Sequence, residues 1–153
     1  EIFETPKNPK TIEMPIVLNI PLTMKVSDPC PPNDLGCKLT LQPIYFDYDQ
    51  SNVRLDAEIE LAKILAALNE YPQLRIHIES HTDSRGRDAY NLKLSQRRAK
   101  STLQWLLDKG IAENRLSAKG YGESQLINKC VNNVACSEEE HQLNRRSMFI
   151  IKE

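Results

Sequence analysis

The chain has almost no excess charge and no long apolar run. Its 153 residues carry 20 Lys and Arg against 21 Asp and Glu, which gives a formal net charge of −1. Such a balance produces no field over the whole protein, so neither nucleic acid nor an anionic membrane is an expected partner. No apolar stretch approaches the roughly 18 residues of a membrane span, and Glu1-Ile2-Phe3-Glu4 is not a secretory signal. We expect a fragment without a membrane span whose targeting segment was removed or lies upstream.

Common catalytic and metal-binding motifs are also missing. There is no His-Glu-x-x-His and no Gly-rich phosphate loop, and the three histidines lack the spacing of metal ligands. Four residues match positions 1, 3, 5 and 12 of a calcium loop, but Asn52 stands where that loop needs glycine; the four are Asp47, Asp49, Ser51 and Glu58. Ser80, His81 and Asp83 lie too close together on an extended segment to form a triad. We predict no catalytic residue, no metal and no cofactor.

The four cysteines form two close pairs, Cys30 with Cys37 and Cys130 with Cys136. Local pairing is the simplest of the three possible disulfide connectivities. Neither pair has the short spacing of a zinc knuckle. Two pairs of reduced surface thiols are also compatible with this sequence. We favour two disulfide-closed loops, and therefore an oxidising compartment such as a periplasm.

Residues 1–38 are predicted to form an extension that precedes the main domain. Every even position from Ile12 to Val26 is apolar, and this period of two indicates a half-buried strand over residues 12–26. Pro15 and Pro21 fall on the opposite phase and would block ladder hydrogen bonds, so we expect an edge strand. The cysteine loop that begins at Cys30 is rich in turn residues and marks the boundary. Such a strand could also pair with the sheet of a partner protein.

Residues 39–153 alternate between strand and helix patterns. Strands are predicted near 44–49, 74–79, 115–120 and 148–151, and polar, irregular sequence over 123–144. The first helix shows an apolar stripe at steps of three and four and stops at Tyr71-Pro72; the stripe is Leu55, Ile59, Ala62, Leu65 and Leu68. The second begins near Asp88 or at Ser95 and ends at Gly110, with four residues directed inward: Ala99, Leu103, Leu106 and Leu107. This order predicts an α+β fold, strand–helix–strand–helix–strand–loop–strand, with helices on one face of one sheet.

Several motifs of this region resemble the OmpA-like C-terminal domain. They are Tyr45-Phe46-Asp47, His81-Thr82-Asp83-Ser84-Arg85-Gly86, Tyr90-Asn91, Leu94-Ser95-Gln96-Arg97-Arg98-Ala99, Gly120-Tyr121-Gly122-Glu123 and Asn144-Arg145-Arg146. That domain is the peptidoglycan-binding module of porins, peptidoglycan-associated lipoproteins and flagellar stator proteins. The resemblance covers residues 39–153 and implies a mixed four-stranded sheet. It also implies noncatalytic binding of the stem peptide at its meso-diaminopimelate, which would anchor a periplasmic or outer-membrane complex to the cell wall. The alternatives are a hydrolase of cell-wall peptide or glycan and a protein–protein interaction domain of an envelope complex. The arrangement of an alternating strand ahead of such a domain resembles that of multidomain envelope proteins of Bacteroidota, including a type IX secretion component.

The resemblance also implies which residues bind the ligand. The motif positions are Asp47, Thr82, Asp83, Asn91, Leu94, Arg98, Asn144, Arg145 and Arg146. Ser80 departs from the family pattern, in which a glycine often precedes His-Thr-Asp.

The chemistry of Asp83 and Arg98 suits a zwitterion. A carboxylate accepts hydrogen bonds from an ammonium, and a guanidinium binds a carboxylate through two parallel bonds. On one helix, Asn91 and Arg98 would share a stripe, about 10 Å apart along the axis. The spacing alone also fits a structural role, in which Asp83 caps its loop and Arg98 pairs with Asp83 or Glu79.

Overall fold

The computed structural model describes residue 39 and residues 41–152, which fall within one compact unit. The predicted strand 12–26 and the pair Cys30–Cys37 lie outside the described residues. The elements are, in chain order, β1 (Ile44–Tyr45), α2 (Leu55–Glu70), β2 (Arg75–Ser80), α3 (Asp88–Asp108), a 3-10 turn η2 (Glu113–Arg115), β3 (Leu116–Gly120), α4 (Glu138–Gln142) and β4 (Arg146–Lys152).

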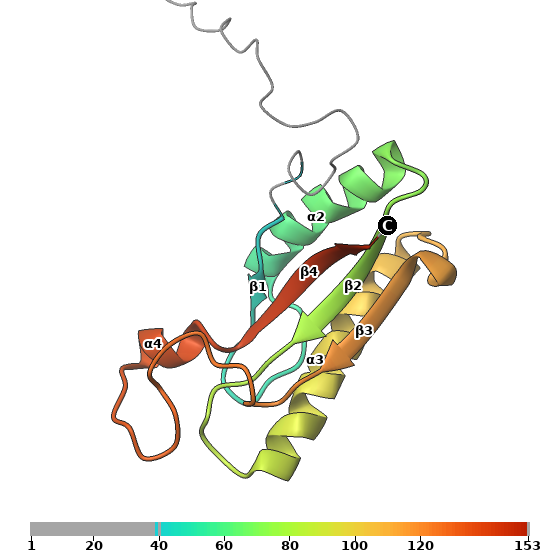
Figure 1. Ribbon diagram of the computed structural model, residues 1–153. Coiled ribbons are helices and arrows are strands. Elements are labelled where there is room, and N and C mark those ends of the chain that lie inside the picture. The colour runs from blue at the N-terminus through green and yellow to red at the C-terminus, as the bar shows by residue number, and fades with distance from the viewer. Residues whose placement is uncertain (1–38, 40, 153) are drawn as a thin grey trace, which may run out of the picture. The chain divides into compact units, whose positions relative to one another are not determined.

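The four strands form one mixed sheet in the order β1-β4-β2-β3. Strands β2 and β3 run parallel, as the crossover through α3 requires, whereas β4 lies antiparallel to both β1 and β2. Helices α2 and α3 pack on one face of the sheet (Figure 1). The predicted α+β architecture and the order of its main elements are therefore confirmed.

Strand β2 and helix α3 follow the predicted patterns most closely. Ile76 and Ile78 are buried on alternate positions of β2, and α3 is one helix from Asp88, with Asn91 and Arg98 on the same buried stripe. Gly110 follows the helix with a φ of +97°, a left-handed conformation that favours glycine.

The predicted inward face of α2 is wrong except at its last residue, Leu68, which is buried. Leu55 and Ile59 are 84% and 63% exposed, and the helix buries a different stripe: Ala57, Leu61, Ile64, Ala67 and Leu68. Both stripes recur at steps of three and four, because α2 is rich in apolar residues on more than one side. Packing against the sheet determines that the second stripe is buried, and the periodicity of the sequence carries no information about this packing.

The prediction that residues 123–144 are wholly irregular is also wrong, since α4 lies within them. Ser137 accepts a hydrogen bond from the Glu140 backbone N–H, while the Glu140 carboxylate accepts one from the Ser137 N–H. This capping box starts the helix. The disulfide Cys130–Cys136 closes the loop just before it, as predicted.

Candidate functional site

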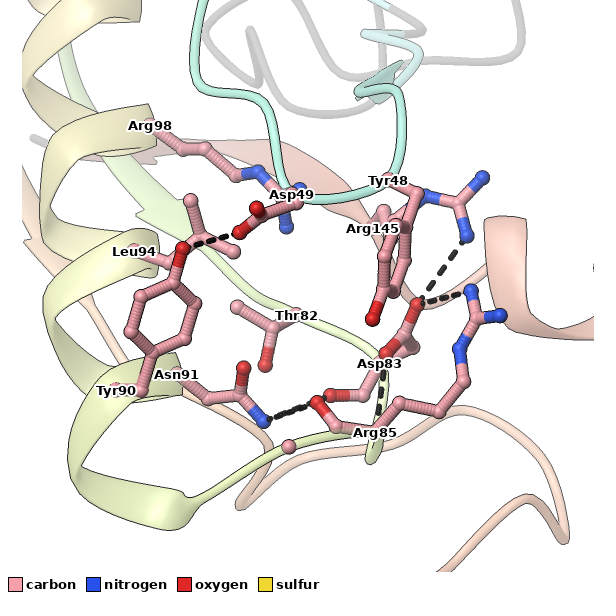
Figure 2. Close-up of a pocket in the computed structure, with 11 residues that line it drawn as sticks. Tyr48, Asp49, Thr82, Asp83, Arg85, Tyr90, Asn91, Leu94, Arg98 and Arg145 are labelled. Atoms are coloured by element: carbon pink, nitrogen blue, oxygen red, sulfur yellow. Dashed lines mark hydrogen bonds and ion pairs between the residues drawn. The ribbon is translucent and has the colours of Figure 1, made fainter.

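Three connections that are distant in sequence meet beyond the carboxyl end of β2 (Figure 1). They are the segment after β1, the loop between β2 and α3, and the turn before β4. Together with the first turns of α3 they enclose a pocket of about 60 Å³ (Figure 2). Its lining is Tyr48, Asp49, Thr82, Asp83, Arg85, Gly86, Tyr90, Asn91, Leu94, Arg98 and Arg145. One water needs about 10–15 Å³, so the pocket suits a small polar group such as the end of an amino acid.

Arg98 is fully buried, and its guanidinium donates to three backbone carbonyls. Nε bonds to Gln50 O at 2.7 Å, Nη1 to His81 O at 3.1 Å and Nη2 to Asp47 O at 3.0 Å. One N–H on each Nη remains for another acceptor. Among the described residues no carboxylate pairs with Arg98, and burial, followed by the nearby Arg145 cation, lowers its pKa to about 10. The cation is therefore charged at neutral pH without a counterion of its own.

Asp83 pairs with two other arginines. Its Oδ1 accepts from the Arg85 backbone N–H at 3.0 Å, and its Oδ2 accepts from Arg85 Nη2 at 2.8 Å and Arg145 Nη1 at 3.2 Å. Burial raises the pKa of Asp83, but the hydrogen bonds from Arg85 and Arg145 outweigh it and leave the pKa below its ordinary value. Asp83 does cap its own loop, as the structural alternative supposed, but its ion pairs are with Arg85 and Arg145.

Arg145 joins the pocket to α4. Its Nε donates to Phe46 O at 2.8 Å, and its Nη2 donates to Glu138 Oε2 at 2.7 Å. The hydrogen bond from Arg145 lowers the pKa of Glu138. Arg145 thus has two carboxylate partners, Asp83 and Glu138, whereas Arg98 has only carbonyls.

Thr82 and Leu94 contribute a hydroxyl and an apolar wall. The Thr82 side chain is 1% exposed, and its Oγ1 has no hydrogen-bond partner within the described part of the chain. Figure 2 shows Thr82 between Arg98 and Asp83. A buried hydroxyl without a partner is costly, so its position on the pocket wall indicates a place for a ligand atom.

Asn91 fixes the shape of the loop between β2 and α3. Its Nδ2 lies 3.3 Å from Asp83 O, 3.0 Å from Arg85 O and 2.8 Å from Glu123 Oε1. Burial raises the pKa of Glu123 despite the bond from Asn91. Asn91 therefore holds the backbone on either side of Ser84 against the start of α3.

Three of the predicted ligand residues support the pocket from outside its lining. Asp47 contributes its carbonyl to Arg98, while its carboxylate lies 3.4 Å from Arg54 Nη1. Asn144 and Arg146 bond to the segment that precedes α4: Asn144 Oδ1 accepts from Ile127 N, and Arg146 Nη2 donates to Gln125 O. Of the two terminal arginines, Arg145 is the one that lines the pocket.

Several pocket residues were not predicted from the sequence. Arg85 and Tyr90 lie inside the motifs but had no predicted role, and Tyr48 and Asp49 lay outside the predicted ligand set. Glu138, which contacts Arg85 and Arg145 from outside the lining, was not predicted either. Tyr90 donates a hydrogen bond to Asp49, and Arg85 lies over the Tyr48 ring, 4.4 Å from its centroid. The one local signal for Arg85 was its place two residues after an aspartate, the spacing of an Asx turn.

Among the described residues, His81, Cys130 and Cys136 are not available to a metal ion. His81 is buried and stacked on Tyr121, with ring centroids 5.5 Å apart, and burial together with the Arg146 cation lowers its pKa to about 4. Cys130 and Cys136 lie near Glu140, but their thiols are joined in the disulfide and cannot bind a metal as thiolates.

This arrangement defines a binding module in which a buried, uncompensated cation and a carboxylate face one small pocket. The OmpA family model matches residues 45–140, and the chain belongs to the OmpA family.

Named relatives agree with this membership. A peptidoglycan-associated lipoprotein of Mesorhizobium japonicum is 38% identical over 105 residues, which are 69% of this chain and 60% of the lipoprotein. Outer membrane porin F of Pseudomonas fluorescens is 42% identical over 84 residues, 55% of this chain and 26% of the porin. The chain thus matches only part of each relative's length.

A solved structure supports the fold. The peptidoglycan-associated lipoprotein of Burkholderia pseudomallei superposes with a TM-score of 0.67 at 28% identity, covering 78% of this chain and 98% of that one. Within the described residues, no helix is both long and apolar enough to cross a membrane.

Proposed function

We propose that the pocket binds the free end of meso-diaminopimelate in the stem peptide of peptidoglycan, and that the module thereby anchors an envelope protein or complex to the cell wall without catalysis. The observation that carries this proposal is Arg98, a fully buried cation with no carboxylate partner in the described part of the chain. An isolated buried charge is costly, and a ligand carboxylate would compensate it. A periplasmic or outer-membrane location fits the family and the disulfide Cys130–Cys136.

The free end of diaminopimelate carries an ammonium and a carboxylate on one carbon. Its carboxylate can accept from the two remaining N–H groups of Arg98, and its ammonium can donate to Asp83. Thr82 Oγ1 can supply a further hydrogen bond, while Leu94 can pack against the methylene chain. Lysine has no second carboxylate, so it would leave Arg98 uncompensated.

The use of the polar groups in the pocket supports a noncatalytic role. The pocket hydroxyl of Thr82 has no hydrogen bond to a base. His81 is buried against Tyr121, and neither ring nitrogen has a partner among the described residues. Nucleophilic catalysis needs a base within hydrogen-bond reach of the nucleophile, and Thr82 has none.

Co-sedimentation with purified sacculi tests the assignment. We expect the wild-type protein to be retained and Asp83→Ala and Arg98→Ala to lose more than tenfold in affinity, because a hydrogen bond to a charged group contributes about 1.5–3 kcal/mol. Arg87→Ala is the matched control, since Arg87 is exposed at the start of α3 and outside the pocket lining.

Arg98→Ala also removes three bonds to the fold, so folding of each variant is checked by circular dichroism. Thr82→Val gives a second test, because it keeps the side-chain volume and removes only a hydroxyl without a partner. It should weaken binding about threefold to tenfold with little change in stability. Equal retention of folded Asp83→Ala, Arg98→Ala and Thr82→Val proteins would show that the pocket is not the wall-binding site.

A further inference from the structure

The side chain of Arg85 lies where the proposed ligand's ammonium would bind. Its Nη2 is 2.8 Å from Asp83 Oδ2, and its backbone N–H is 3.0 Å from Oδ1. Asp83 Oδ1 accepts only from the Arg85 backbone N–H, whereas Oδ2 accepts from both Arg85 and Arg145. An ammonium that binds Oδ2 as well as Oδ1 must therefore replace one of the two arginines.

Of the two arginines, Arg85 is the easier to move. The Arg145 side chain is 3% exposed and is fixed by Phe46 O and Glu138, whereas the Arg85 side chain is 36% exposed and packs on the face of Tyr48. Arg85 Nε also has no hydrogen-bond partner within the described structure. Two hydrogen bonds hold the Arg85 side chain, whereas three hold the more deeply buried side chain of Arg145.

A second carboxylate lies next to Arg85. Glu138 Oε1 is 3.2 Å from the same Nη2 atom that contacts Asp83, and Glu138 Oε2 is 2.7 Å from Arg145. Arg85 Nη2 is thus shared between Asp83 and Glu138. Its guanidinium can leave Asp83 while keeping a carboxylate partner, so its charge need not become unpaired.

We propose that Arg85 is a displaceable internal cation: the ligand ammonium replaces it at Asp83, and Glu138 keeps it paired after displacement. This inference rests on the proposed function, since it assigns the ammonium of a zwitterionic stem peptide to Asp83. Asp83 and Glu138 balance Arg85 and Arg145 before binding. The zwitterionic end of the ligand adds one positive and one negative charge, so binding leaves the net charge of the pocket unchanged.

The exchange makes the site selective for a free amine. A peptide whose terminal amine is acylated has no positive charge there and cannot replace a guanidinium at Asp83. Glu138 would then act as a specificity residue of the wall-binding site, although it lies 55 residues beyond Asp83 in the sequence.

Calorimetric titration with a synthetic tripeptide that ends in meso-diaminopimelate tests the exchange. We expect Arg85→Ala and Arg85→Gln to bind this peptide about twofold to fivefold more tightly than the wild type, the range that loss of a partly exposed competing ion pair supports. Arg87→Ala, which removes the same charge two residues away, should bind like the wild type. The gain should be confined to the free amine, so the same peptide with that amine acetylated should bind the Arg85 variants no more tightly.

Glu138→Gln provides the second arm. It should weaken binding in the wild-type background and have a smaller effect when Arg85 is already alanine, with Glu139→Gln as the control. If the wild type binds the tripeptide but the folded Arg85 variants bind equally or less well, or gain equally with the acetylated peptide, displacement is wrong and the proposed function stands. If neither the wild type nor the Arg85 variants bind, both proposals fail; binding by the variants alone would support displacement.

Discussion

Two arginines at the pocket, Arg98 and Arg145, show that burial alone does not define a functional cation. Both are almost completely buried, but Arg145 has two carboxylate partners and Arg98 has three carbonyls. Carbonyl dipoles stabilise a cation without cancelling its charge. Arg98 therefore keeps an unsatisfied attraction for an anion, and Arg145 stabilises the network around Asp83.

His81 should make stability depend on pH. Burial and then the Arg146 cation lower its pKa from 6.5 to about 4, so the unfolded chain takes up a proton first as the pH falls. The stabilising effect of the neutral ring is complete above about pH 6.5 and is lost progressively as the pH falls to about 4. Urea unfolding at pH values from 4 to 8 should show this decline.

His81→Phe is the informative control for that titration. Phenylalanine can keep the stack on Tyr121 and does not titrate, and the histidine ring nitrogens have no partners to lose in the described structure. The variant should lose less stability than the wild type between pH 6.5 and 4. Equal losses in the two proteins would show that other groups cause the decline.

At the scale of elements, the sequence was most informative where one period dominated. Alternation at Leu74, Ile76 and Ile78 identified β2, and Gly110 marked the end of α3. Helix α2 was different, because its apolar residues allow two stripes and only tertiary packing excludes Leu55 and Ile59 from the core. Helix α4 has five residues, too few for a period, although the capping box of Ser137 and Glu140 could have indicated its start.

The sequence predicted which motifs belong to the candidate site, but not which of its side chains contact one another. The resemblance placed Asp83, Asn91, Arg98 and Arg145 in the set, and all four line one pocket. It could not show that Asp83 pairs with Arg85, or that Glu138 reaches both Arg85 and Arg145. The contacts of Glu138 depend on how the loop before α4 folds back, which no local pattern encodes.

Gly120 should be intolerant of even one added methyl group. A Cβ at this position would lie 2.4 Å from Gln96 N and 2.5 Å from both the carbonyl carbon and Oγ of Ser95. These are atoms of α3, so the helix would have to move away from β3. Gly120→Ala should lower the free energy of unfolding by at least about 1–3 kcal/mol, measured by urea denaturation.

Gly110→Ala gives the comparison for this substitution. Gly110 has open space around its Cα, so its substitution costs only the strain of a φ of +97°, about 1 kcal/mol. If close packing between β3 and α3 determines the loss of stability, Gly120→Ala will lower the free energy of unfolding more than Gly110→Ala. A smaller effect of Gly120→Ala would mean that α3 adjusts easily.

For the whole molecule, the disulfide loop is part of the site and not only a surface addition. Cys130 is buried, its carbonyl accepts a hydrogen bond from Ser84 Oγ at 2.5 Å, and Glu138 follows the second cysteine by two residues. Closing the loop 130–136 restricts the unfolded chain and keeps α4 beside Arg85 and Arg145. The disulfide would thus support the residues behind the pocket as well as stabilise the fold.

Residues 39–153 should fold and bind the wall without residues 1–38. All pocket residues lie between Tyr48 and Arg145, and the buried apolar residues of the described structure lie between Ile44 and Phe149. The fragment should show a cooperative unfolding transition and bind sacculi within about twofold of the full chain, a difference of less than about 0.5 kcal/mol. The fragment with Asp83→Ala is the matched control and should lose retention. A folded fragment that no longer binds, while the full chain does, would place part of the wall-binding surface in residues 1–38.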